Sequence, residues 1–145
     1  MQAPARLRWA TLAAGLWWGS LSALMLLVVP LLFMHLPSAQ MAGSMAARLF
    51  SAQTWLTSLC CLLLLLVFNR AQDEDLLALG RAVLRPVIAG LLLALLVELA
   101  LAPRILAARG QEGQSLRLWH GLTSAMYLAQ WLCALGVLWR LARRP

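Results

Sequence analysis

The sequence has few charged residues and no lysine, because all twelve of its basic residues are arginine and only five residues are acidic. Hydrophobic residues fill 63% of its 145 positions, well above the share of roughly half that is usual in water-soluble domains. The polar and apolar alternation that indicates half-buried strands is also missing. These absences exclude an ordinary soluble domain and argue against a sheet.

Cysteine is scarce and catalytic signatures are absent. Cys60, Cys61 and Cys133 are odd in number and lie inside apolar runs, where a thiol behaves as a small apolar side chain. The sequence contains no nucleophile elbow, phosphate-binding glycine loop or HExxH motif. We therefore expect a protein that is not an enzyme and has no catalytic residue.

What the sequence does contain is four long apolar stretches. A membrane-crossing helix needs about 20 apolar residues to cover roughly 30 Å of hydrocarbon, and a helix satisfies its own backbone polar groups there. The predicted spans are residues 9–34, 44–68, 86–102 and 118–139. Because the connections are short, residues 1–145 are predicted to form one all-α domain, an integral membrane bundle of four transmembrane helices that run up-down-up-down.

The arginines lie near the ends of these spans, and their distribution predicts an orientation. Loops rich in arginine tend to stay in the cytoplasm, so we expect both termini on the cytoplasmic side of the membrane, with lipid headgroups as partners. No nucleic-acid-binding motif accompanies the charge, and no nucleic acid is expected. The predicted cytoplasmic side has eight of the arginines, Arg6, Arg8, Arg70, Arg81, Arg85, Arg140, Arg143 and Arg144. The predicted outer side has the other four, Arg48, Arg104, Arg109 and Arg117.

One carboxylate, Glu98, lies within a predicted span. Gly90, Ala94, Glu98 and Ala102 recur every four residues, so Glu98 belongs to a stripe of small residues that should face other helices. A charge in a span costs several kcal/mol unless it is paired or hydrated. We expect Glu98 to pair with Arg48 or His120.

Glu98 and its expected partners Arg48 and His120 predict a polar layer near the outer face of the membrane. At about 1.5 Å per residue, Glu98 would lie some 6 to 9 Å below the end of its helix. The layer is interpreted as a binding site for a partner, lipid or small solute; as an alternative, the chain is a subunit of an oligomeric transporter with Glu98 as a proton or cation site. The candidates are Glu98, Arg48, His120, Gln53, Ser124 and Tyr127.

Histidine and methionine near the same face raise a metal alternative. Thioether and imidazole donors suit Cu(I), and His35, His120 and Met34 are the candidate ligands. His35 and His120 are also conceivable ligands of a haem. Histidines at helix ends commonly form interfacial hydrogen bonds and methionine commonly fills apolar helices, so we expect no cofactor and keep copper and haem as alternatives.

Small residues repeat every four positions on the first and last spans. Gly15 and Gly19 form a GxxxG pair, and Gly121 and Ala125 begin the second series. Such seams let helices approach closely. They predict contacts within the chain or between two copies in a homo-oligomer.

The inner loop carries acidic residues before a helical stretch. Asp73, Glu74 and Asp75 fit an N-terminal cap and the helix dipole, which predicts a short interfacial helix leading into the third span. Pro86 then marks either the start of that span or a kink in one longer helix.

Several blocks resemble a known family. They are "LWWGSLSALMLLVVPLLFMHLP" (16–37), Gly43, "RLF" (48–50), "APR" (102–104) and "LWHGLTSAMYL" (118–128). In this order they resemble the bacterial branch of the transmembrane protein 205-like family, which implies a four-helix domain of unknown function in a bacterial inner (plasma) membrane. The resemblance marks Gly19, Pro37, Gly43, Phe50, Pro103, His120, Gly121 and Ser124.

Overall fold

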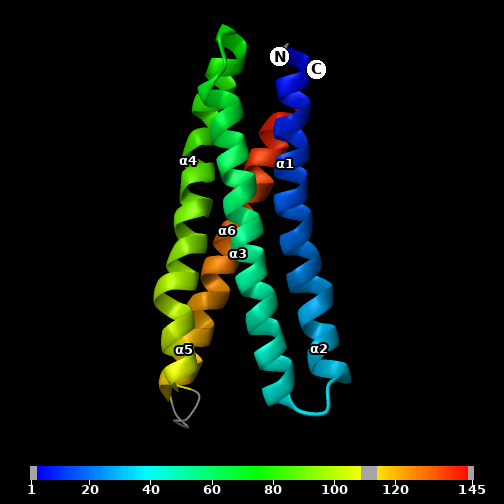
Figure 1. Ribbon diagram of the computed structural model, residues 1–145, viewed down its shortest axis with the longest axis vertical. Coiled ribbons are helices and arrows are strands. Elements are labelled where there is room, and N and C mark those ends of the chain that lie inside the picture. Colours follow the sequence, from blue (N-terminus) through cyan, green and yellow to red (C-terminus); the bar gives the residue numbers. More distant parts are fainter. Residues whose placement is uncertain (1–2, 109–113, 144–145) are drawn as a thin grey trace.

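The computed structural model of the chain describes residues 3–108 and 114–143. These residues form α-helices joined by short connections and interrupted by two π-helical segments (Figure 1). The elements are α1 (Ala3–Ala23), η1 (Leu24–Val28), α2 (Val29–His35), α3 (Ala39–Asn69), α4 (Glu74–Leu96), η2 (Val97–Leu101), α5 (Ala102–Ala108) and α6 (Gln114–Ala142).

Four helical stretches are long and apolar enough to cross a membrane. They are Ala5–His35, Ala39–Asn69, Glu74–Ile105 and Leu118–Ala142. Figure 1 shows them running alternately up and down, with the start of α1 and the end of α6 at the same end of the bundle as the α3–α4 turn. The predicted all-α fold of four membrane-spanning helices is confirmed.

Local sequence explains where two of the helices begin. The Ser38 hydroxyl accepts a hydrogen bond from the Met41 backbone N–H (3.2 Å) and caps α3. The Asp73 carboxylate accepts one from the Asp75 N–H (3.1 Å) at the start of α4, as the acidic cluster predicts. The expected short interfacial helix is not separate, since α4 continues through Pro86, and Pro86 therefore lies inside one longer helix.

The core lies where the four long helices meet. α1 packs against α3 and α6, and α4 packs against the same two helices. Trp17 is fully buried and its indole lies against Gly90 on α4. Large apolar side chains from all four helices complete the core, among them Leu21, Leu64, Val83, Val87 and Val137.

Each π-helical segment lies just before a proline. Pro30 follows η1 and Pro103 follows η2, in both cases as the second residue after the segment ends. Proline has no N–H, and its ring conflicts with the carbonyl four residues earlier. That carbonyl belongs to Leu26 in η1 and to Leu99 in η2. The wider π turn relieves the conflict without ending the helix.

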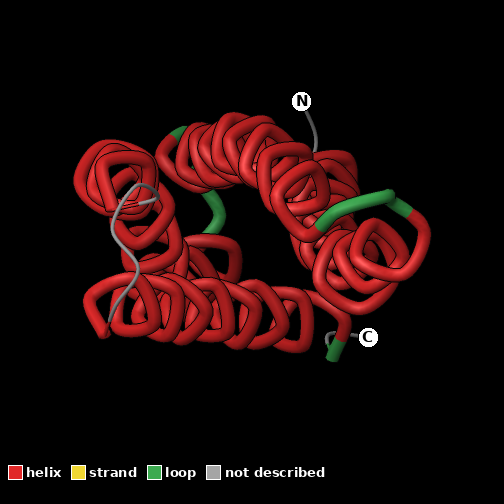
Figure 2. The backbone as a smooth tube through the Cα atoms, turned by 90° about the horizontal axis from the view of Figure 1, so that it is seen from below, coloured by secondary structure: helices red, strands yellow, loops and turns green. Residues whose placement is uncertain are grey.

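Beyond these segments the bundle divides into two pairs. At the end opposite the termini, α2 packs on α3 and α5 packs on α6. Figure 1, together with the view from below in Figure 2, shows the α2–α3 loop away from α5. Side chains on α2 and the first turns of α3 are accordingly exposed, including Phe33, Met34, Met41 and Met45.

Candidate functional site

Glu98 pairs with a neutral hydroxyl. It lies in η2 and is half-buried, and the Ser51 hydroxyl of α3 donates a hydrogen bond to its Oε1 atom. The expected partners Arg48 and His120 are both exposed, and no ion pair involving Glu98 occurs within residues 3–108 and 114–143. The expected pairing is therefore wrong. It fails because Arg48 lies one turn further toward the end of the bundle where the helices separate into two pairs, and because His120 is on an exposed side of α6.

A second polar contact joins α3 to α1. The Gln53 side chain is 6% exposed, and its Nε2 atom donates to the Ser20 hydroxyl (2.9 Å) and, on its own helix, to Thr57 Oγ1 (3.4 Å). The Ser20 hydroxyl donates in turn to the Trp17 carbonyl (3.1 Å). Gln53, a candidate from the sequence, is thus held in a buried network.

Tyr127 brings α6 to the same region. Its side chain is buried and stacks against Phe50 of α3, with ring centroids 4.4 Å apart. It also lies close to Thr54 and within electrostatic range of Glu98. Tyr127 therefore connects the Glu98 contact to the interior of the bundle.

Gln130, one turn further along α6, is completely buried. Neither its Nε2 nor its Oε1 atom has a hydrogen-bond partner among the residues that the structure describes. The same applies to the indole nitrogens of Trp17 and Trp18. By contrast, the Trp131 indole donates to the Ser22 hydroxyl (2.8 Å). Because an unpaired buried amide is costly, Gln130 needs a structural or binding explanation.

We call this set of residues, contributed by all four long helical stretches, the interior polar layer. It consists of Ser20, Ser51, Gln53, Thr57, Glu98, Tyr127 and Gln130. The candidates predicted from the sequence did not include Gln130, Ser20, Ser51 or Thr57. The signal that would have found Ser51 and Thr57 is the recurrence of hydroxyl and amide residues in the middle of α3, from Ser51 to Ser58.

The layer is deeper than predicted. Ser51 is twelve residues after Ala39, the first residue of α3, which is about 18 Å along the helix axis. Glu98 is ten residues before Ala108, where α5 ends, or about 15 Å. The predicted depth of 6 to 9 Å was too small because the helix does not stop at Ala102.

The remaining predicted residues do not join the layer. Ser124, His120, His35 and Met34 are exposed, and the His35 ring forms a hydrogen bond through Nδ1 to the Leu31 carbonyl (3.1 Å). In the described ranges, no group of three or more His, Cys, Asp or Glu side chains is arranged to hold a metal ion. Copper and haem binding stay untested predictions. Arg109 and Arg144, used to predict the orientation, lie outside the described residues.

The glycine seams are not packed inside the chain. A Cβ atom placed on Gly15, Gly19 or Gly121 would meet nothing within 4 Å, whereas Gly90 and Ala94 of the Glu98 stripe are buried. The stripe therefore faces the other helices as predicted. The GxxxG pair on α1 and the start of the α6 seam leave open surface.

A helical bundle with four stretches apolar enough to cross a membrane and polar side chains gathered in its interior defines a multi-pass membrane protein. The chain belongs to the family described as "Domain of unknown function (DUF4149)", whose profile matches residues 12–114. The matched range contains Ser51, Gln53 and Glu98, while Tyr127 and Gln130 lie beyond it. Comparisons with curated proteins and with solved structures found no match.

Proposed function

We propose that this chain is an integral protein of the bacterial inner membrane that binds a small solute through the interior polar layer and has no catalytic role. The sequence blocks noted above support a place in the bacterial branch of the transmembrane protein 205-like family. The observation that carries the proposal is Glu98, a carboxylate inside a candidate membrane span whose only hydrogen bond in the described chain comes from the neutral Ser51 hydroxyl.

An intramembrane carboxylate without a cation is unstable as a charge. It costs several kcal/mol unless it gains a proton or a cationic partner. Gln130 adds a buried amide that has both a donor and an acceptor unused within the described residues. A small solute with a cationic or hydrogen-bond-donating group would satisfy Glu98. We therefore propose small organic cations as the class to test first.

The test is a thermal-unfolding series on the protein purified in mild detergent, followed by the fluorescence of its seven tryptophans. The probes are ethylammonium, N-methylguanidinium and tetramethylammonium, with acetamide as the neutral comparison. A ligand that binds only the folded state raises its stability by RT ln(1 + [L]/Kd), which is about 2.7 kcal/mol at a hundredfold excess over Kd. At least one cation should raise the unfolding temperature of the natural protein.

Two variants separate a specific site from a general salt effect. Glu98→Gln should abolish the shift, because it keeps the size of the side chain and removes the charge. Glu74→Gln, which changes an exposed acid at the start of α4, should keep it. An equal shift in both variants, or no shift with any probe, would reject the proposal.

A second candidate function is a subunit of an oligomeric transporter, with Glu98 as its proton or cation site. It is favoured by the open glycine faces at Gly15, Gly19 and Gly121, which suit close contact between copies. Gly121→Cys should then form disulfide-linked dimers in native membranes, and Leu122→Cys, an exposed position about 100° further round the same helix, should do so less. Monomers alone for both variants would count against this candidate.

A further inference from the structure

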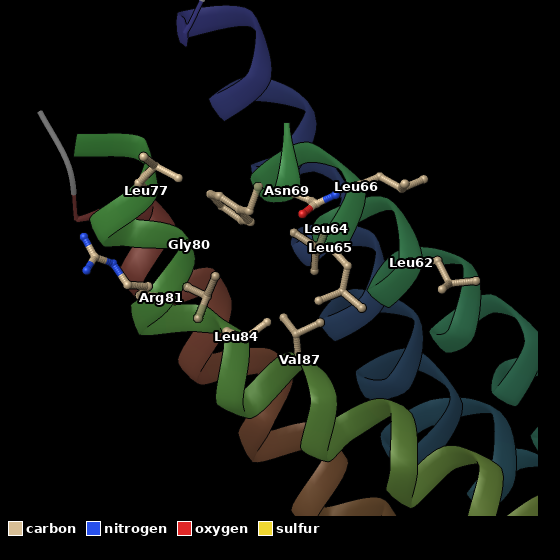
Figure 3. A pocket seen from close by; sticks show the side chains of 12 residues that line it. Leu62, Leu64, Leu65, Leu66, Asn69, Leu77, Gly80, Arg81, Leu84 and Val87 are labelled. Carbon is tan, nitrogen blue, oxygen red and sulfur yellow. The ribbon is translucent and has the colours of Figure 1, made fainter. Parts of the chain in front are cut away.

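A groove opens between α3 and α4 near the end of the bundle that holds the α3–α4 turn. It has a volume of about 390 Å³ and is lined almost entirely by apolar side chains (Figure 3). Asn69 lies at its upper edge, and Arg81 is on its α4 flank with the guanidinium directed away from α3. The main walls are Leu62, Leu65, Leu66, Leu77, Leu84 and Val87.

Close packing at one point sets the alignment of the two helices there. A Cβ atom on Gly80 would lie 3.1 Å from the Phe68 side chain, so α4 touches α3 at this level. The groove walls nevertheless stay open to the membrane, since Leu66 is 53% and Leu84 42% exposed. A leucine surface of this kind accepts a hydrocarbon chain and offers nothing to a polar solute.

Arg81 lines this groove at a level where α3 is still apolar, and Arg85 is on the same helix, outside the lining residues. Arg81 directly follows Gly80 and so lies level with Phe68, and Arg85 is one turn deeper. Both are exposed, and neither forms an ion pair with any residue of the described chain. As like charges four residues apart on one helix they repel each other. Asp75, the nearest acidic residue of α4, is six residues before Arg81, about 9 Å along the axis.

We propose that this groove and the two arginines bind an anionic phospholipid, with part of an acyl chain between α3 and α4 and the phosphate on Arg81 and Arg85. A phosphate between the two guanidinium groups removes their repulsion and forms charge-assisted hydrogen bonds with both. Arginines close to a membrane surface favour anionic over neutral lipid by this electrostatic attraction. The lipid site is at the opposite end of α4 from Glu98 and does not depend on solute binding there.

Native mass spectrometry of the detergent-purified protein tests the proposal. The protein is mixed with phosphatidylglycerol or phosphatidylcholine of identical acyl chains, and the bound fractions are compared. From the contribution expected of two arginines, about 1 kcal/mol each, phosphatidylglycerol should be retained about thirtyfold more strongly. Equal retention of the two lipids would overturn the proposal without any variant.

Variants then assign the two parts of the site. Arg81→Gln with Arg85→Gln should reduce phosphatidylglycerol to the level of phosphatidylcholine. Leu84→Trp, which fills the groove, should reduce retention of both lipids, whereas Leu92→Trp, at an exposed leucine of α4 outside the groove, should leave retention unchanged. Identical behaviour of Leu84→Trp and Leu92→Trp would overturn the groove as the site of the acyl chain.

A soluble headgroup distinguishes a lipid from a free phosphate. Glycerol phosphate has the same phosphate chemistry and no acyl chain, so it should not displace phosphatidylglycerol from the natural protein at equal concentration. Complete displacement would show that the arginines bind the phosphate alone, and the docking of lipid in the groove would be rejected.

Discussion

The indole of Trp17 lies so close to Gly90 that a Cβ atom at position 90 would be 2.4 Å from the indole carbons Cη2 and Cζ2. Trp17 is completely buried, so the ring has no room to move away. This contact joins α1 to α4 across the bundle. It explains why glycine occupies a helix interior, where it is otherwise unfavourable by roughly 1 kcal/mol relative to alanine.

Gly90→Ala is therefore expected to destabilise the fold by about 1 to 3 kcal/mol through overpacking, despite the better helix propensity of alanine. Thermal unfolding in one detergent measures the effect. Gly121→Ala is the matched control, since its new methyl group would meet nothing within 4 Å, and it should be neutral or slightly stabilising. The Trp17→Phe background should reduce the cost of Gly90→Ala. A cost that is the same for both glycines would contradict the contact.

Removing the Ser51 hydroxyl should leave the Glu98 carboxyl without a donor. Ser51→Ala is expected to cost about 1 to 3 kcal/mol, measured by the same unfolding experiment. Ser44→Ala removes an exposed hydroxyl of α3 that donates to the Met41 carbonyl of its own helix, and it should change stability by less than about 0.5 kcal/mol. The double variant Ser51→Ala with Glu98→Leu should recover most of the loss, because both polar partners are then gone. No difference between the two serine variants would refute the pairing.

The two buried glutamines should respond in opposite directions to replacement by leucine. Gln53→Leu breaks the bond to Ser20 and should destabilise the protein by about 1 to 3 kcal/mol. Gln130→Leu removes an amide that has no partner among the described residues, and it should be neutral or stabilising while lowering any solute-induced shift. Unfolding temperatures with and without the responsive cation measure both effects. A large loss of stability on Gln130→Leu would show that its amide is bonded.

Impermeant maleimide labelling tests the proposed orientation. Cys60, Cys61 and Cys133 lie inside candidate spans and are buried or half-buried, so a hydrophilic reagent should not reach them. In intact spheroplasts Gln40→Cys, near the α2–α3 loop, should be labelled, and Gln72→Cys, in the α3–α4 turn, should react only after lysis. The reverse pattern would place both termini outside the cytoplasm.

Much of the architecture follows from local sequence alone. The four apolar runs predict four helices, because each run is long enough to cross a bilayer and only a helix satisfies its backbone there. The four-residue spacing of Gly90, Ala94 and Glu98 correctly predicts that this face of α4 turns inward. Pro30 and Pro103 are visible in the sequence, but the π-helical turns before them are an adjustment of the whole helix that residue patterns did not indicate.

The partner of Glu98 was decided only by the tertiary structure. Arg48, Ser51 and Gln53 are all within two turns on α3. Which of the three contacts Glu98 depends on the orientation of α3 about its own axis and on its axial position relative to η2. Helix packing also decides which polar side chains are buried, since Gln130 is buried and Ser124 on the same helix is exposed. Hydrophobicity along the chain determines which segments become helices. Which polar side chains meet depends on packing between segments far apart in the sequence, because close packing selects one rotation and one depth for each helix.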